Sequence, residues 1–131
     1  MFRRRRRVWR RRRTRVTRHY SKNKETARMV ITEKIKRYNE IYQYRLARIS
    51  IRNQKTRWGS CSKSGNLNFN YKILFLEEQL ADYIVVHELC HLQELNHSQK
   101  FWNLVAQVFP NHRELRGELR RKVLDNFSIK N

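Results

Sequence analysis

Hydrophobic residues in the first third of the chain follow a helical period. Between residues 22 and 44, apolar side chains recur every three or four positions, at Ala27, Val30, Ile31, Ile35, Tyr38, Ile41 and Tyr42. This spacing predicts an amphipathic helix whose opposite face is mainly basic and polar. Ser21 has the side chain of an N-cap residue, so we expect the helix to begin there.

The pattern changes to a period of two after this helix. Residues 45–53 alternate between apolar and polar side chains, which is typical of a half-buried strand. Two further segments, 56–62 and 66–71, flank a short polar turn that ends at Gly65. The sequence therefore predicts a small antiparallel sheet of three strands.

A second, more apolar helix follows the sheet. Glu77 and Glu78 begin it, where acidic side chains complement the helix dipole. Residues 83–86 are apolar on almost every side, so we expect this helix to be buried in the centre of the domain and to run to Leu95. Asn96 tolerates the left-handed conformation that ends many helices, and we expect it to stop this one.

Two shorter helices complete the predicted fold. Ser98 can N-cap a helix over residues 99–109, and Pro110 closes that helix before a last one from residue 111 to about residue 124. The expected fold class is α+β. It comprises an N-terminal helix, a small three-stranded antiparallel sheet, a central helix and two C-terminal helices.

The length of 131 residues suits one domain with one core, but residues 1–20 stand apart because they contain 11 Arg and no acidic residue. Like charges at this density repel, so we expect residues 1–20 to form a disordered arm and residues 21–131 to form the domain. A net charge of +20 favours polyanionic partners. The arm is a candidate nucleic-acid-binding segment, although a solvated tail or a targeting peptide would also fit. Its candidate phosphate-binding residues are Arg3, Arg4, Arg5, Arg6, Arg7, Arg10, Arg11, Arg12 and Arg13.

The candidate for chemistry is the run from His87 to His91, which has the pattern HExxH. On a helix these two histidines are separated by about 400° of rotation, so both imidazoles project from one face. Two neutral imidazoles at this spacing can bind one Zn²⁺, with Glu88 beside them as a general base. His97 can supply a third imidazole if the chain turns after Leu92, because a continuous helix would point it away from the other two.

Cysteine content and hydropathy indicate where the protein acts. Cys61 and Cys90 are too few for a disulfide framework, and we expect both to be reduced in a cytoplasmic protein. The sequence has no apolar run near the ~18 residues of a membrane span, and no apolar stretch near its start is typical of a signal peptide. We therefore expect no membrane partner.

Four sequence blocks together resemble the YgjP-like metallopeptidase family, which is related to M48-type and SprT-type zincins. The blocks are RWGSC at 57–61, GNLNFN at 65–70, the run with HELCHL at 82–92, and NHSQKFW at 96–102. The resemblance covers about residues 45–125.

The resemblance implies a compact zincin-like fold and a zinc-dependent peptidase acting on a peptide or protein. Its zinc ligands would be His87, His91 and His97, and Glu88 would be the general base. Three imidazoles leave a fourth position for water, whose pKa zinc lowers to about 7. Glu88 would take the proton of this water and pass it to the leaving amine.

Other residues are candidates for substrate binding or for the third ligand. If the strand before the central helix lies at the sheet edge, an extended peptide can add to it, which makes Asn66, Asn68 and Asn70 candidate contacts. Arg57 or His112 are candidates for stabilising the oxyanion. In gluzincins the third ligand is a glutamate on a later helix, and here the glutamates in that region are Glu114 and Glu118.

Two other functions fit parts of the sequence. The first is hydrolysis of a nucleotide such as UTP, which the broader grouping of the family suggests. The chain has no glycine-rich phosphate loop, however, and such enzymes usually use Mg²⁺ with oxygen ligands. The second is a nucleic-acid-binding module with structural zinc, alone or combined with peptidase activity; Glu88 in the base position opposes the purely structural version.

Overall fold

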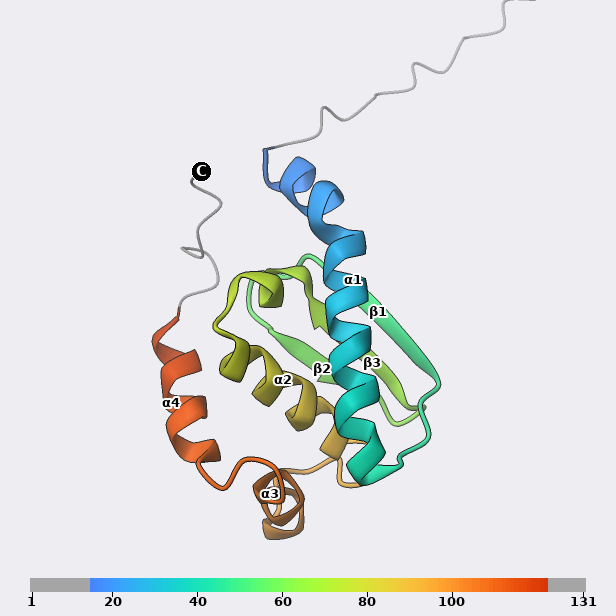
Figure 1. Ribbon diagram of the computed structural model, residues 1–131, viewed down its shortest axis with the longest axis vertical. Helices are drawn as coiled ribbons and strands as arrows, with labels where there is room; N and C mark the ends of the chain where they lie inside the picture. Colours follow the sequence, from blue (N-terminus) through green and yellow to red (C-terminus); the bar gives the residue numbers. More distant parts are fainter. Residues whose placement is uncertain (1–14, 123–131) are drawn as a thin grey trace, which may run out of the picture.

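The structure is a computed structural model that describes residues 15–122. The arginines predicted to bind nucleic acid, in residues 3–13, lie outside this range. Two helices, α1 (Arg15–Tyr42) and α2 (Glu78–Cys90), pack against each other over a small sheet (Figure 1). Two shorter helices, α3 (Gln99–Ala106) and α4 (His112–Arg121), pack against α2. The expected α+β, zincin-like fold is confirmed in its helices and its small sheet.

Helix α1 begins earlier than the sequence predicted. It starts at Arg15, and Ser21 lies inside it, so the prediction of an N-cap at Ser21 was wrong. Tertiary contacts hold the added turns: the His19 Nδ1 lies 2.8 Å from the Tyr71 hydroxyl, and the Tyr20 hydroxyl donates to a main-chain carbonyl of the sheet over 2.9 Å. Residues 15–20, which we assigned to the arm, are therefore helical. Neither α1 nor any other described helix is apolar and long enough to cross a membrane.

The sheet has three strands, β1 (Arg48–Arg52), β2 (Gly59–Cys61) and β3 (Asn66–Asn70), in the order β1-β3-β2. Strand β2 pairs with β3 in antiparallel fashion, as predicted, but β1 is parallel to β3. The sheet is therefore mixed, and the prediction of a wholly antiparallel sheet was wrong. The chain between β1 and β2 crosses to the far side of β3 instead of forming a hairpin, which places β3 in the centre.

The hydrophobic core lies between the sheet, α1 and α2. The predicted alternation in β3 is present, because Leu67 and Phe69 are fully buried, and a 3₁₀ helix (Tyr71–Phe75) then leads the chain into α2. The buried apolar stripe of α1 matches the sequence pattern. The fully buried residues of these elements include Ala27, Ile31, Leu67, Phe69, Tyr71, Leu80, Val85, Val86 and Leu89.

A buried polar cluster ties α1 to α2. Asp82 on α2 accepts a 2.6 Å hydrogen bond from the Lys34 ammonium and a 2.7 Å hydrogen bond from the Tyr38 hydroxyl, both on α1. Each carboxylate oxygen of Asp82 therefore has a partner, which offsets the cost of burying the charge.

Helix α2 ends sooner than predicted. It stops at Cys90, with His91 as its C-cap, and does not continue to Leu95. Asn96 does not end it through a left-handed residue, because Gln43 is the non-glycine residue with positive φ in the described part of the chain. The chain instead turns through residues 91–98.

The last two helices follow the predicted order. The Ser98 side chain accepts a hydrogen bond from the main-chain N–H of Phe101, so the predicted N-cap is present at the start of α3 (Gln99–Ala106). Helix α4 (His112–Arg121) follows after a short turn at Pro110. Figure 1 shows α4 on the side of α2 away from α1, whereas α3 lies beyond the C-terminal end of α2. There the Tyr42 hydroxyl at the end of α1 donates to the Leu104 carbonyl oxygen of α3 over 2.7 Å.

Candidate metal centre

Three imidazoles converge at the C-terminal end of α2. His87 lies in the last turn of the helix, His91 is its C-cap, and His97 comes from the loop that follows. The Nε2 atoms are 3.2 Å apart for His87 and His91, 3.1 Å for His91 and His97, and 3.2 Å for His87 and His97. Two nitrogens bound about 2.0–2.1 Å from a tetrahedral zinc are roughly 3.3–3.4 Å apart. The triangle therefore has nearly the size of one face of a zinc tetrahedron.

Hydrogen bonds at the other ring nitrogens orient two of these imidazoles. The His91 Nδ1 lies 2.9 Å from the Glu94 carbonyl oxygen, which can only accept, so the Nδ1–H donates and the Nε2 carries the lone pair. The His87 Nδ1 lies 3.4 Å from the Tyr83 hydroxyl. Such partners at the outer nitrogen fix the tautomer of metal-binding histidines. The donor set therefore fits a zinc ion.

The environment keeps the histidines uncharged. Burial, helped by the neighbouring His91 and His97 and by the positive charge of Arg116, lowers the pKa of His87 to about 3. Burial is also the main cause that lowers the pKa of His91 and of His97. A metal ligand must be unprotonated, so these shifts favour metal binding at neutral pH.

Two aromatic side chains of α3 hold the imidazoles in place. The Phe101 ring is fully buried and stacks on His91, with 4.3 Å between ring centroids. Trp102 stacks on the more exposed His97 at 5.8 Å. The N-cap at Ser98 starts α3 directly after His97, so the same short helix positions both rings and the third histidine.

Glu88 is buried next to His87 and lines the same cleft. Its Oε2 accepts no hydrogen bond from any described residue. Burial raises the pKa of Glu88 to about 8, and the positive charge of Arg57 opposes this shift. A Cβ atom at Gly59 would lie 3.0 Å from the Glu88 Cγ and 3.1 Å from the Asn68 carbonyl oxygen, so the lack of a side chain at Gly59 leaves room for Glu88.

His87 and Glu88 line an open cleft of about 620 Å³. Residues 55–59, which lead into β2, line it together with part of α2. The remainder of the lining belongs to α4 and the residue after it, Lys122. Glu88 and one imidazole therefore border a cleft whose volume is in the range of ligand-binding pockets.

The three asparagines predicted to contact substrate lie elsewhere. Asn66, Asn68 and Asn70 belong to β3, which is bonded to strands on both sides, so no peptide can add to it. Asn70 is fully buried and donates to the main-chain carbonyls of Gln54 and Arg57 over 2.7 and 2.9 Å. The Asn68 side chain bonds to side chains of the flanking strands. The condition for the prediction, that this strand is an edge, is not met.

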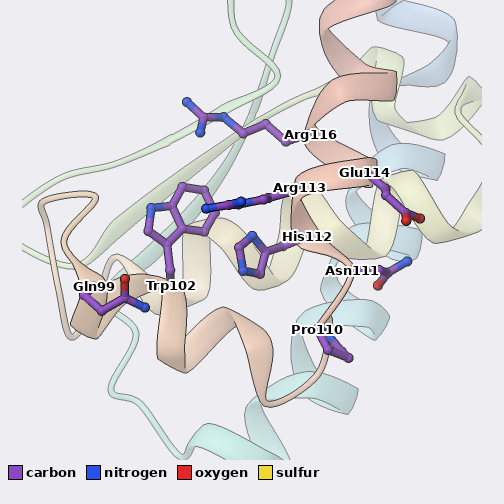
Figure 2. Close-up of a pocket in the computed structure, with 8 residues that line it drawn as sticks. All are labelled: Gln99, Trp102, Pro110, Asn111, His112, Arg113, Glu114 and Arg116. Atoms are coloured by element: carbon purple, nitrogen blue, oxygen red, sulfur yellow. The ribbon is translucent and has the colours of Figure 1, made fainter.

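The other candidates fall on two sides of the centre. Arg57 lines the cleft with Glu88, whereas His112 stacks on the far side of Trp102 with 4.8 Å between ring centroids. His112 and Glu114 line a separate cavity of about 450 Å³, in which the Glu114 carboxylate points away from Trp102 (Figure 2). Among residues 15–122, the three histidines are the cluster that could hold a metal, and it includes neither Glu114 nor Glu118.

Sequence reasoning missed three residues of the site. Tyr83 precedes His87 by four positions, so helical spacing could have placed both on one face. Trp102 stood out only as part of the NHSQKFW block and as an apolar residue of an amphipathic helix, and neither signal indicated a contact with a histidine. Arg116 lines both cavities and lies 5.3 Å from the Trp102 ring centre, and only the packing of α4 brings it there.

The sequence matches a family described as the YgjP-like metallopeptidase domain over residues 6–122. The chain belongs to this family. This confirms the resemblance seen in the sequence blocks. No curated protein matches the sequence of this YgjP-like domain.

Two solved structures of metallopeptidase zymogens are similar to this YgjP-like domain. Abylysin from Pyrococcus abyssi is 29% identical, with a TM-score of 0.64 over 71% of this chain and 94% of that one. Jannalysin from Methanocaldococcus jannaschii is 24% identical, with a TM-score of 0.61 over 70% of this chain and 94% of that one. At this identity, the similarity to jannalysin supports the fold and nothing further. The described structure thus has a metallopeptidase fold with a histidine cluster that could bind a metal.

Proposed function

We propose that this protein is a zinc-dependent metallopeptidase that cleaves peptide bonds with an activated water. One observation carries the proposal: three Nε2 atoms lie within 3.2 Å of one another beside a buried carboxylate oxygen that has no partner among the described residues. Buried polar atoms are nearly always hydrogen-bonded, and unpaired ones point to chemistry. Membership of a metallopeptidase family supports the same conclusion.

His87, His91 and His97 would hold the zinc ion. When bound, zinc supplies a Lewis acid and lowers the pKa of a coordinated water to about 7. Three neutral nitrogen ligands are typical of a catalytic site that keeps one position open, whereas structural zinc sites usually have four protein ligands. The contacts of the His87 Nδ1 with the Tyr83 hydroxyl and of the His91 Nδ1 with the Glu94 carbonyl oxygen would keep the Nε2 lone pairs directed inward.

Glu88 would act as the general base. Burial favours the protonated carboxyl in the metal-free chain, whereas a cation held by the histidines would favour the carboxylate. The Oε2 of Glu88, which has no partner among the described residues, would then accept the proton of the attacking water and return it to the leaving amine. The positive charge of Arg57 would favour the carboxylate form of Glu88, because it counteracts the effect of burial on the Glu88 pKa. Arg57 lines the same cleft, and in this proposal it would meet a carbonyl oxygen of the substrate.

The edge strand β2 offers a place for the substrate main chain. Ser62 N–H donates to Asn66 and Asn70 N–H donates to Trp58, so the hydrogen-bonded pairs of this ladder include Ser60. The intervening Gly59 and Cys61 therefore direct their main-chain groups to the free edge of the sheet. An extended peptide can pair there as an added strand, next to Glu88.

The Glu88→Gln variant tests the proposal. Wild-type and variant proteins are loaded with zinc and assayed on a peptide mixture, an unfolded protein and UTP. We expect peptide or protein hydrolysis to fall at least about a hundredfold with zinc content unchanged, because the amide cannot accept a proton. Glu118→Gln is the matched control, since this glutamate lies on α4 outside the cleft lining, and it should keep full activity.

Two results would contradict the proposal. The first is equal hydrolysis by the wild type and Glu88→Gln in every assay, which would show that the site performs no base catalysis. The second is hydrolysis of UTP without hydrolysis of any peptide or protein, which would assign the site to nucleotide chemistry.

A further inference from the structure

The cleft beside Glu88 is lined with positive charge. Five of its thirteen lining residues are basic, and Glu88 itself is the single acidic one. The basic residues come from two parts of the chain: the segment before β2, and α4 with the residue after it. They are Lys55, Arg57, Arg116, Arg120 and Lys122.

No acidic residue between residues 15 and 122 forms an ion pair with these cations. In the described part of the chain, the ion pairs involve Arg28 and Lys34 on α1, and none involves a basic residue of the cleft. Arg116 and Arg120 are exposed and lie four residues apart on α4, so they project from the same face of this helix into the cleft. The positive potential of the cleft is therefore available to a ligand.

The field of these charges reaches the reacting groups. Arg57 and Arg116 line the same cleft as His87 and Glu88. A cleft with one sign of charge and low-dielectric walls concentrates ligands of the opposite sign. A substrate that brings carboxylates would thus be favoured at the position where bond cleavage takes place.

We propose that this cleft selects acidic polypeptide segments, with Asp or Glu side chains of the substrate bound by Arg116 and Arg120 on one side and by Lys55 and Arg57 on the other. The inference rests on the proposed peptidase function and names its substrate class. The arginines are suited to this role because the guanidinium group binds a carboxylate through two parallel hydrogen bonds.

An acidic polypeptide fits the cleft better than a nucleic acid does. The cleft borders Gly59, whose main-chain N–H and C=O both point to the free edge of the sheet. An extended peptide can pair with both groups, whereas the phosphate oxygens of a nucleic acid only accept and leave the carbonyl without a donor. Single-stranded nucleic acids also need successive aromatic platforms for their bases. The cleft lining holds two aromatic rings besides the imidazole, and one of them, Tyr83, is buried in α2.

The test is a set of three fluorogenic peptides of equal length that carry Glu, Gln or Lys at the positions flanking the cleavable bond. The wild-type zinc enzyme should cleave the Glu peptide about tenfold more efficiently than the Gln peptide, with the Lys peptide slowest, and the difference should lie mainly in KM. The preference should shrink as NaCl rises from about 0.05 to 0.5 M, since salt screens exposed charges.

Arg120→Glu and Arg121→Glu form a matched pair of variants. Both residues are exposed neighbours at the end of α4, and both changes alter the net charge equally, but Arg120 lines the cleft and Arg121 does not. Arg120→Glu should lower the Glu-to-Lys ratio of kcat/KM about five- to thirtyfold and raise the rate on the Lys peptide. Arg121→Glu should change the ratio by less than about twofold. A gain on the Lys peptide cannot come from misfolding.

Three outcomes would overturn the inference. Equal kcat/KM for the three peptides would refute acidic selection but leave the peptidase function intact. Equal effects of the two variants would place the selectivity outside the cleft. Competition by a single-stranded oligonucleotide that is lost in Arg120→Glu but not in Arg121→Glu, without a peptide preference, would assign the cleft to nucleic acid. Failure to cleave any peptide would instead refute the proposed function itself.

Discussion

Helix α2 carries two polar clusters that differ in whether their buried polar atoms have hydrogen-bond partners. Asp82 is buried on the side facing α1, and each of its carboxylate oxygens has a hydrogen-bond partner. Five residues later, about 140° around the helix, His87 and its neighbours face α3. There, three Nε2 atoms face one another and the Glu88 Oε2 has no partner among the described residues.

The difference separates a structural cluster from a chemical one. A satisfied polar cluster holds two elements in one arrangement and has no capacity left for a ligand. A cluster that is preorganised but lacks hydrogen-bond partners can bind a cation and accept a proton. Its unpaired buried groups cost free energy, which the packing of the surrounding fold must offset. Changes at Asp82 should therefore affect stability, and changes at the histidines and Glu88 should affect metal binding and catalysis.

The largest expected effect is on metal binding in His97→Ala. Loss of one imidazole should weaken zinc binding about 10²- to 10³-fold, since zinc sites with four ligands bind with roughly 10–16 kcal/mol and each ligand supplies about a quarter. Competition with a chelator at neutral pH measures the change. Glu114→Ala should bind zinc normally; if it lost zinc while His97→Ala kept it, the third ligand would lie on α4.

The next effect is on stability in Asp82→Asn. Removing this carboxylate leaves the Lys34 ammonium without its buried partner, so the free energy of unfolding should fall by about 2–4 kcal/mol with zinc affinity nearly unchanged. Urea denaturation of the zinc-loaded proteins provides the measurement. Glu78→Gln is the control, because Glu78 is exposed and 3.6 Å from the same ammonium, and it should cost less than about 0.5 kcal/mol. Weaker zinc binding without a stability loss would contradict the assignment.

A pH-dependent effect is expected for Glu88 in the metal-free protein. The pKa of this carboxyl is raised to about 8 in the folded chain, from 4.5, so the folded state keeps a proton that the unfolded state releases. Stability from this group is therefore lost as pH rises from about 4.5 to 8. Metal-free Glu88→Gln should unfold at similar urea concentrations to wild type near pH 4.5, and be more stable by about 1–3 kcal/mol at pH 8. A constant difference across this range would refute the raised pKa.

The smallest effect is expected at Gly59. A methyl group there would meet Glu88 and the Asn68 carbonyl at 3.0 and 3.1 Å, so Gly59→Ala should cost about 1 kcal/mol in stability and reduce kcat by displacing Glu88. Gly117→Ala on α4 is the matched control. Its added methyl would meet nothing closer than 3.8 Å, and alanine in a helix should raise stability by about 0.5–1 kcal/mol. Normal kcat in Gly59→Ala would show that this close contact does not position the base.

Much of the fold could be predicted because its determinants are local. The apolar period of α1, the alternation of Leu67 and Phe69 in β3, and the cap at Ser98 depend on neighbours within a few residues. The errors arose where contacts between distant segments of the chain determine where an element begins or how strands pair. Helix α1 begins more than one turn before the predicted start at Ser21. Its added residues His19 and Tyr20 hydrogen-bond to residues over thirty positions away, which no local N-cap signal can reveal.

The metal site divides in the same way. The sequence by itself determined that His87, Glu88 and His91 share one helix with both imidazoles on one face, since four-residue spacing fixes the directions of the two histidines, and that His97 requires a turn. Only the tertiary structure decided that His97 reaches the other two, because α3 packs Phe101 and Trp102 around them. The strand order was likewise a tertiary decision: hydrogen bonding between β1 and β3 puts β3 in the centre, leaves β2 as the free edge beside Glu88, and moves the expected place for a substrate from one strand to the other.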